Sequence, residues 1–127
     1  MSSRSALAVL AVILIGAVFR FAFIGRQSFH IEEAYSFLES QKPAGILLAD
    51  CARDVHPPLH LLLLHWWTLA SPGEAGARSL SAVAGIASLL LVYLIGRRLS
   101  GAATALTAIV IAAPSPFLLW YSQETRP

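Results

Sequence analysis

Charged residues are scarce in this sequence. Of its 127 residues, only 13% are charged, whereas 57% are hydrophobic. A soluble domain has about 25% charged residues, so this chain has too few to cover a surface that faces water. Its lysines and arginines are scattered and do not form the dense basic face of a nucleic-acid-binding protein. The composition therefore predicts a membrane protein with no nucleic-acid partner.

Several motifs with well-defined chemistry are also missing. Cys51 is the only cysteine, which excludes an intrachain disulfide and a metal site built from several cysteines. The sequence contains no glycine-rich phosphate loop, no zinc-binding HExxH motif and no Ser-His-Asp order. Any chemistry must therefore come from the polar residues that lie between the apolar runs.

Those apolar runs predict three transmembrane helices, over residues 6–24, 79–96 and 102–121. Each is close to the roughly 20 residues that a helix needs to cross a bilayer. The first run contains Arg20 near its end, where a long side chain can extend to the interface. It could also be a cleaved secretory signal, but the following FRFAFIG has no small-x-small cleavage pattern. Pro114 and Pro116 are expected to bend or end the last helix near its exit.

The segment between the first two spans, residues 25–77, is different in composition. Residues 25–58 hold five of the seven acidic residues of the chain. We expect two short helices here, over residues 33–41 and 58–70. The second is too short to cross a bilayer, and its two tryptophans suit the headgroup layer.

If residues 58–70 do not cross, the acidic segment and the C-terminal YSQETRP emerge on the same side of the membrane. Arg4 and the Arg97–Arg98 pair then lie on the opposite side, as the positive-inside rule prefers for the cytoplasm. The predicted fold is an all-α membrane protein with three transmembrane helices and two juxtamembrane helices in the first extracytoplasmic loop.

Two adjacent carboxylates, Glu32 and Glu33, lie close to the predicted membrane boundary. Such a pair is often only a solvated surface. Here Tyr35 follows on a predicted helix, and a second polar stretch, DVHPP, returns to the same side before the next apolar segment. Partial desolvation at an interface raises the pKa of a carboxyl group, which suits a general base. Carboxylate oxygens can also hold a hard divalent cation.

Two further polar groups could meet a phosphate. His56 precedes two prolines and could contact a phosphate or a metal ion, or only make a structural hydrogen bond. Arg126, in YSQETRP, could clamp a phosphate oxygen, although this segment could equally be an ordinary interfacial cap. His60 and His65 lie within an apolar run, so we interpret both as structural.

Four segments in order are HIEEAYS, DVHPPLHLLLLHWW, RSLSAVAGIASLLLVYLIGRRLSG and WYSQETRP. Together they resemble the N-terminal part of the GT-C glycosyltransferases, in the bacterial branch akin to protein O-mannosyltransferases and lipid A aminoarabinose transferases. The resemblance extends over nearly the whole chain from Arg20. It implies a multi-pass enzyme of the cytoplasmic (inner) membrane. Such an enzyme transfers a sugar from a polyprenyl-phosphate carrier to a lipid, glycan or protein acceptor at the outer face, with inversion.

The resemblance also implies site residues. The Asp-Glu pair in the first loop of this family matches Glu32 and Glu33, which are therefore the expected catalytic residues. Glutamate replaces aspartate at the first position and is one methylene longer. The implied substrate-binding residues are Tyr35, Asp54, His56, Gln123, Glu124 and Arg126. A divalent metal ion, Mg, Mn or Zn, would be held by Glu32 and His56.

The family has many more spans than this sequence, which stops at Pro127 within the last motif. We therefore expect an N-terminal portion, over residues 1–127, that alone does not turn over substrate. The alternatives are a small non-enzymatic membrane protein that binds a partner and a piece of a transporter. A transporter would favour charged residues inside its spans, and residues 79–96 and 102–121 contain none.

Overall fold

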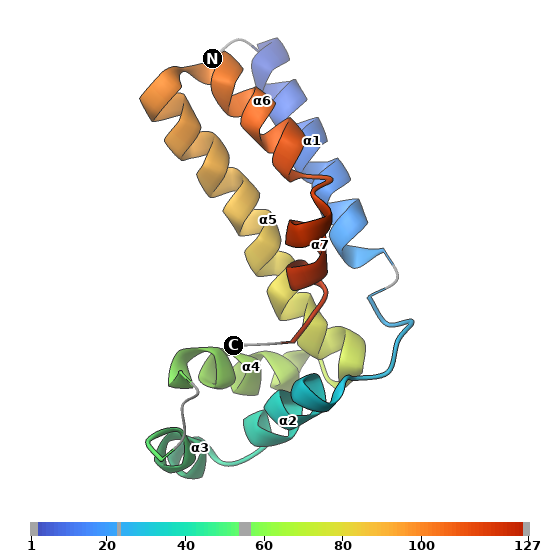
Figure 1. Cartoon of the computed structure of the whole chain (residues 1–127), viewed down its shortest axis with the longest axis vertical. Coiled ribbons are helices and arrows are strands. Elements are labelled where there is room, and N and C mark those ends of the chain that lie inside the picture. Colours follow the sequence, from blue (N-terminus) through green and yellow to red (C-terminus); the bar gives the residue numbers. More distant parts are fainter. Residues whose placement is uncertain (1–2, 23, 54–56, 126–127) are drawn as a thin grey trace. The chain divides into compact units, whose positions relative to one another are not determined.

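The computed structural model describes residues 3–22, 24–53 and 57–125. Within these ranges every regular element is a helix and there is no strand. The helices labelled in Figure 1 are α1 (Ser3–Phe21), α2 (Ile31–Ser40), α3 (Ala44–Cys51), α4 (Pro58–Ala70), α5 (Gly73–Ser100), α6 (Ala102–Ala112) and α7 (Pro116–Ser122). The predicted all-α class is confirmed.

The chain divides into two compact units. One comprises residues 1–22 and 82–123, and we call it the span unit. The other comprises residues 23–81 and 124–127, and we call it the loop unit. Helix α5 contributes its first residues to the loop unit and the rest to the span unit. Each unit has its own buried groups, which are described separately.

In the span unit, α1 packs along α6 and α7, and Figure 1 shows α1 and α6 side by side. The buried cluster joins Val9 of α1 and Tyr93 of α5 to Ala105 and Ile109 of α6. The turn between α5 and α6 contains Gly101 at φ +89°, a backbone angle that favours glycine. This unit is therefore a small helical bundle with an apolar centre.

The break between α6 and α7 confirms the effect expected of the two prolines. Helix α6 ends at Ala112, α7 begins at Pro116, and their axes differ by 68°. Pro114 and Pro116 have no backbone N–H, so carbonyls in the preceding turn lose their usual donors. The apolar run of residues 102–121 therefore consists of two helices, α6 and α7.

One helix among the described residues, α5, is long and apolar enough to cross a membrane. Helices α6 and α7 are long and apolar enough to cross a membrane only when they are taken together as one bent pair. The apolar helix Ser5–Phe21 within α1 is shorter than a spanning helix of this kind. Helix α5 extends beyond the predicted 79–96 at both ends. One span is thus supported by length and composition, and the other two remain predictions.

In the loop unit, α2 and α3 both pack against α4. Leu47 of α3 and Leu61 and Leu64 of α4 are buried. Polar contacts join α4 to the end of α2: His65 Nδ1 lies 2.6 Å from the Ser40 carbonyl oxygen. His65 thus has the structural role that its apolar surroundings predicted.

The two predicted short helices of this segment are present. Helix α4 has the predicted bounds, whereas α2 begins at Ile31, two residues before the predicted start. Helix α3 was not predicted, since Pro43 and Gly45 lie at its start and both residue types disfavour the interior of a helix. Instead, Pro43 precedes the first residue of α3, a position at which its missing N–H has no partner to lose.

Candidate functional site

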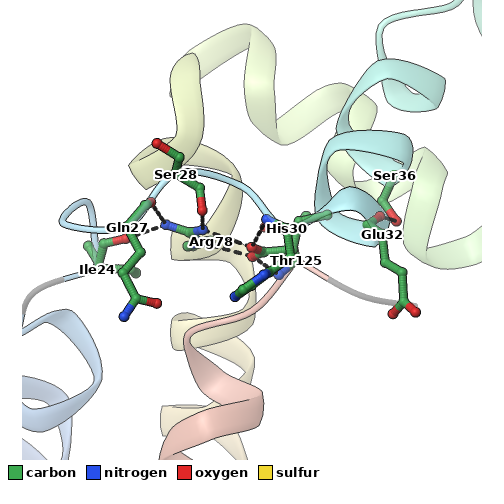
Figure 2. Close-up of polar contacts among 9 residues, drawn as sticks. Ile24, Gln27, Ser28, His30, Glu32, Ser36, Arg78 and Thr125 are labelled. Atoms are coloured by element: carbon green, nitrogen blue, oxygen red, sulfur yellow. Dashed lines mark hydrogen bonds and ion pairs between the residues drawn. The ribbon is translucent and has the colours of Figure 1, made fainter.

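A buried ion pair joins Glu33 to Arg78 in the loop unit, and Figure 2 shows the polar contacts around Arg78. Glu33 lies in the first turn of α2, and Arg78 lies near the start of α5. Arg78 Nε is 2.9 Å from Glu33 Oε1, and Arg78 Nη2 is 2.8 Å from Glu33 Oε2. The exposed fractions are 1% for Glu33 and 4% for Arg78. This two-point geometry is the strongest form of an arginine–carboxylate contact.

Two backbone N–H groups complete the environment of the Glu33 carboxylate. The His30 N–H donates to Oε2 at 3.1 Å, and the Thr125 N–H donates to Oε1 at 3.0 Å. The His30 bond follows from the local sequence, since a glutamate three residues after a helix N-cap often accepts from the N-cap backbone. With the two Arg78 bonds, each carboxylate oxygen accepts two hydrogen bonds, which uses its full acceptor capacity.

Arg78 also organises the chain that leads into α2. Its Nη1 donates to the carbonyl oxygens of Ile24, at 3.1 Å, and Gln27, at 2.7 Å. Its Nη2 also donates to the Ser28 carbonyl oxygen at 3.3 Å (Figure 2). All five N–H donors of the guanidinium group are therefore engaged. One side chain at the start of α5 holds residues 24–28 and the first turn of α2 in place.

These contacts lower the pKa of Glu33. Burial alone would raise it, but the hydrogen bonds from Arg78, Thr125 and His30, together with the positive charge of Arg78, lower the pKa to about 2. Glu33 is therefore ionised at physiological pH, and its lone pairs are already in use. Such a carboxylate is well suited to holding a structure and poorly suited to accepting a proton.

The side chain of Glu32, unlike that of Glu33, is not buried. Its side chain is exposed, and Figure 2 shows it extending away from Arg78. Its backbone carbonyl accepts a hydrogen bond from Ser36 Oγ at 3.1 Å, one turn later in α2. Tyr35 is also exposed, with 44% of its surface accessible. Tyr35 follows Glu32 by three positions, so the two lie on neighbouring positions of one helix face.

Two neighbouring polar residues near the C-terminus, Gln123 and Glu124, belong to different units. In the span unit, Gln123 Nε2 donates to the carbonyl oxygens of Phe19, at 2.9 Å, and Ala22, at 3.1 Å. In the loop unit, Glu124 is buried, and its negative charge acts on Arg78. The other predicted substrate-binding residues, Asp54, His56 and Arg126, lie outside the described residues.

The predicted metal site is not completed by the residues that the structure describes. Among them, no three histidine, cysteine, aspartate or glutamate side chains group closely enough to hold a metal ion. Glu33 already has four hydrogen-bond donors, and His56 lies outside the described ranges. The remaining histidine of interest, His60, is partly buried, and burial lowers its pKa, so it is neutral at physiological pH.

Arg78 is the site residue that sequence reasoning missed. No role was predicted for it, and in the sequence it directly precedes the apolar run of residues 79–96. The available signal was an arginine at the start of such a run, together with carboxylates in the preceding segment. A buried charge needs a partner, but the sequence does not say which of several acidic residues supplies it.

One comparison with known proteins identifies a family. Residues 55–127, more than half of the chain, match the family model described as dolichyl-phosphate-mannose-protein mannosyltransferase. The chain belongs to this family, which consists of membrane glycosyltransferases. The matched range includes Arg78 and the C-terminal polar segment, and Glu32 and Glu33 precede it. No curated protein and no solved structure matches the chain.

Proposed function

We propose that this chain forms part of an enzyme that transfers a sugar from a polyprenyl-phosphate carrier to a lipid, glycan or protein acceptor. Family membership supplies the reaction class. The observation that carries the assignment to this site is the contrast between two adjacent glutamates. Glu33 is fixed by Arg78, and Glu32 is exposed one residue before it.

This contrast supports a division of roles. Two neighbouring carboxyl groups in different environments commonly have different functions, one structural or electrostatic and the other in proton transfer. Glu33 fixes the first turn of α2 and thereby the backbone of Glu32. Glu32 is the general base of the proposed reaction, although it is one methylene longer than the aspartate expected at this position.

The proposed step is a displacement at the anomeric carbon of the sugar. The hydroxyl oxygen of the acceptor attacks the anomeric carbon of the sugar, while the hydroxyl proton passes to the Glu32 carboxylate. The bond between the anomeric carbon and the phosphate oxygen breaks, and its electron pair leaves with the carrier phosphate. Attack from the opposite side inverts the anomeric carbon. No part of this step is assigned to a metal ion.

The other predicted residues take supporting roles in the proposal. Tyr35 contacts the acceptor, because it shares a helix face with Glu32. Asp54, His56, Glu124 and Arg126 contribute to the part of the site that holds the sugar and its phosphate. A base beside the membrane can reach an acceptor that arrives from water, while the lipid tail of the donor stays in the bilayer.

The apolar surface of α4 supports a position at the membrane surface. Leu59, Leu63 and Trp66 recur at helical spacing and are exposed, with accessible fractions of 66%, 50% and 63%. Such a stripe on a short helix is typical of a helix that lies in the plane of the interface. In the proposal, α1, α5 and the α6–α7 pair cross the cytoplasmic membrane, and residues 25–77 form an extracytoplasmic loop.

The test compares two neighbouring substitutions, Glu32→Gln and Glu33→Gln, in membranes from cells that express the protein from its own gene. We expect Glu32→Gln to lower transfer from radiolabelled polyprenyl-phosphate mannose by about 100-fold or more, since a general base contributes about 10²- to 10⁴-fold. Its thermal stability should match that of the wild type. Glu33→Gln should lower both activity and stability.

Glu32→Asp is the matched control, because it keeps the carboxylate and restores the residue expected at this position. It should retain measurable transfer. Undiminished transfer by Glu32→Gln would contradict the assignment of the base. Absence of transfer by the wild type with several lipid-linked donors would instead favour a non-enzymatic, partner-binding membrane protein.

A further inference from the structure

Arg20 is an unusual feature of the span unit. It is the largest fully buried side chain of the described residues, with an exposed fraction of 1%. The sequence of the span unit contains arginines but no aspartate or glutamate. An arginine side chain does not lose its charge in proteins, and a charge within a predicted span is costly unless it is compensated. Some other group in this unit must stabilise Arg20.

Two backbone carbonyls take this role. Arg20 Nη1 donates to the carbonyl oxygen of Gly16, one turn earlier in α1, at 3.0 Å, and to that of Ala113 at 3.3 Å. Ala113 follows the last residue of α6, where a helix leaves its final carbonyls without donors. The C-terminal end of a helix also carries a partial negative charge. Because Arg20 lies at the ends of both α1 and α6, two helix ends provide negative potential without a carboxylate.

Hydrogen bonds also run in the reverse direction, from α7 to α1. Gln123 follows the last residue of α7, and its Nε2 donates to the carbonyl oxygens of Phe19 at 2.9 Å, Arg20 at 3.3 Å and Ala22 at 3.1 Å. These three carbonyls lie at the end of α1, where the helix has no donors of its own. Each of the two segments therefore caps the other.

We propose that Arg20 and Gln123 form a two-way clasp that holds the α6–α7 bend against the end of α1. On the proposed function, Gln123 is then a positioning residue of the transferase, and not the substrate ligand that the sequence predicted. The side-chain amide of Gln123 is directed to the backbone of α1, so its donors are not available to a substrate. The clasp also explains how a bend at two prolines keeps a defined geometry, since the freed Ala113 carbonyl has a fixed donor.

The test uses the donor and acceptor chemistry of residue 123 in the purified chain in detergent, without any substrate. Gln123→Lys keeps N–H donors and adds a positive charge that suits a helix C-terminus. Gln123→Met removes the donors at similar size, and Gln123→Glu places acceptors against acceptors. We expect the wild type and Gln123→Lys to have the highest unfolding temperatures, Gln123→Met one that is lower by a few degrees, and Gln123→Glu the lowest. If Gln123→Glu cannot be purified in folded form, the comparison of Gln123→Lys with Gln123→Met decides.

Hydrogen exchange separates loss of the clasp from general destabilisation. In Gln123→Met, amides of α7 and of the last turn of α1 should exchange faster, while those in the middle of α5 keep their wild-type rates. Equal unfolding temperatures and equal α7 exchange rates for all variants would overturn the clasp.

In the active enzyme, Gln123→Lys should keep the wild-type KM. A raised KM for Gln123→Met with unchanged stability would show a substrate ligand instead. The stability and exchange results do not depend on activity, so they hold even if the proposed transferase reaction fails.

Discussion

Two arginines, one in each unit, are almost completely buried, and their charges are stabilised in different ways. Arg78 of the loop unit has a carboxylate partner, Glu33, and all five of its donors are engaged. Arg20 of the span unit has no acidic residue in its unit and donates to the carbonyls of Gly16 and Ala113. In the span unit, backbone carbonyls at or near helix ends thus accept hydrogen bonds from a buried arginine where the loop unit uses a carboxylate.

The two kinds of acceptor, a carboxylate for Arg78 and backbone carbonyls for Arg20, hold different parts of the molecule in place. A carboxylate that neutralises an arginine is itself fixed and depleted of lone pairs, so the Glu33–Arg78 pair is a rigid support next to the exposed Glu32. Carbonyls that stabilise an arginine fix backbone segments instead, so Arg20 ties together helices. The first arrangement is typical of the surroundings of a site.

The largest effect should come from breaking the pair in the loop unit. Removing one partner of a buried ion pair leaves an uncompensated charge and costs about 3–5 kcal/mol. We therefore expect Glu33→Met to lower the free energy of unfolding by roughly this amount, measured by thermal or chemical unfolding in detergent. Glu32→Met is the matched neighbour and should change stability little, because its side chain is exposed.

The double variant Glu33→Met/Arg78→Met sharpens this result. Replacing both partners removes the uncompensated charge, so the double variant should be less destabilised than the sum of the single changes. Recovery should be incomplete, because Arg78 also donates to the carbonyl oxygens of Ile24, Gln27 and Ser28. Strict additivity of the two single changes would contradict a direct energetic coupling between Glu33 and Arg78.

The pH dependence of stability gives a second measure of the same pair. The pKa of Glu33 is about 2 in the folded chain, against an ordinary value of 4.5. A carboxyl group with a lowered pKa stabilises the fold above its unfolded pKa, and this contribution is lost as pH falls through its folded pKa. Since a pKa difference of one corresponds to about 1.4 kcal/mol, the free energy of unfolding of the wild type should fall by roughly 3 kcal/mol between pH 4.5 and 2.

Glu33→Gln should lack this component of the pH profile. Other carboxyl groups titrate in the same range, so the informative quantity is the difference between the wild-type and Glu33→Gln profiles. The two profiles should converge as the pH falls toward 2. Parallel profiles from pH 6 to pH 2 would mean that Glu33 has an ordinary pKa and would contradict the pair as described.

Much of the helical framework could be predicted from the sequence, because it depends on local pattern. The apolar runs, the bounds of α4 and the break caused by Pro114 and Pro116 all follow from residues close together in the chain. Helix α3 did not, since Pro43 breaks a helix in its interior but is compatible with the position before its first turn. The local sequence allows both outcomes, and packing against α4 selects one.

The site was less predictable because its contacts join distant residues. Glu32 and Glu33 are adjacent and chemically equivalent in the sequence, and only the partner 45 residues away distinguishes them. The contact of Thr125 with Glu33 joins residues 92 positions apart. The resemblance implied that Gln123 binds substrate. The acceptors of its side-chain amide in the structure are backbone carbonyls, which carry no signal in the sequence.

The smallest of the expected effects concerns the space that Arg20 needs in the span unit. A methyl group on Gly85 would lie 2.8 Å from Arg20 Nε and closer still to Ser122 Oγ, which is itself held by the Leu118 carbonyl. Gly85→Ala should therefore lower the free energy of unfolding by about 1–3 kcal/mol, as is usual for overpacking. Gly45→Ala is the matched control within a helix, because nothing lies within 4 Å of the added carbon. It should raise stability by about 0.5–1 kcal/mol, measured by the same unfolding experiment. If Gly85→Ala were as stable as Gly45→Ala, Arg20 would have room to move, and its place between the two helix ends would not be fixed by packing.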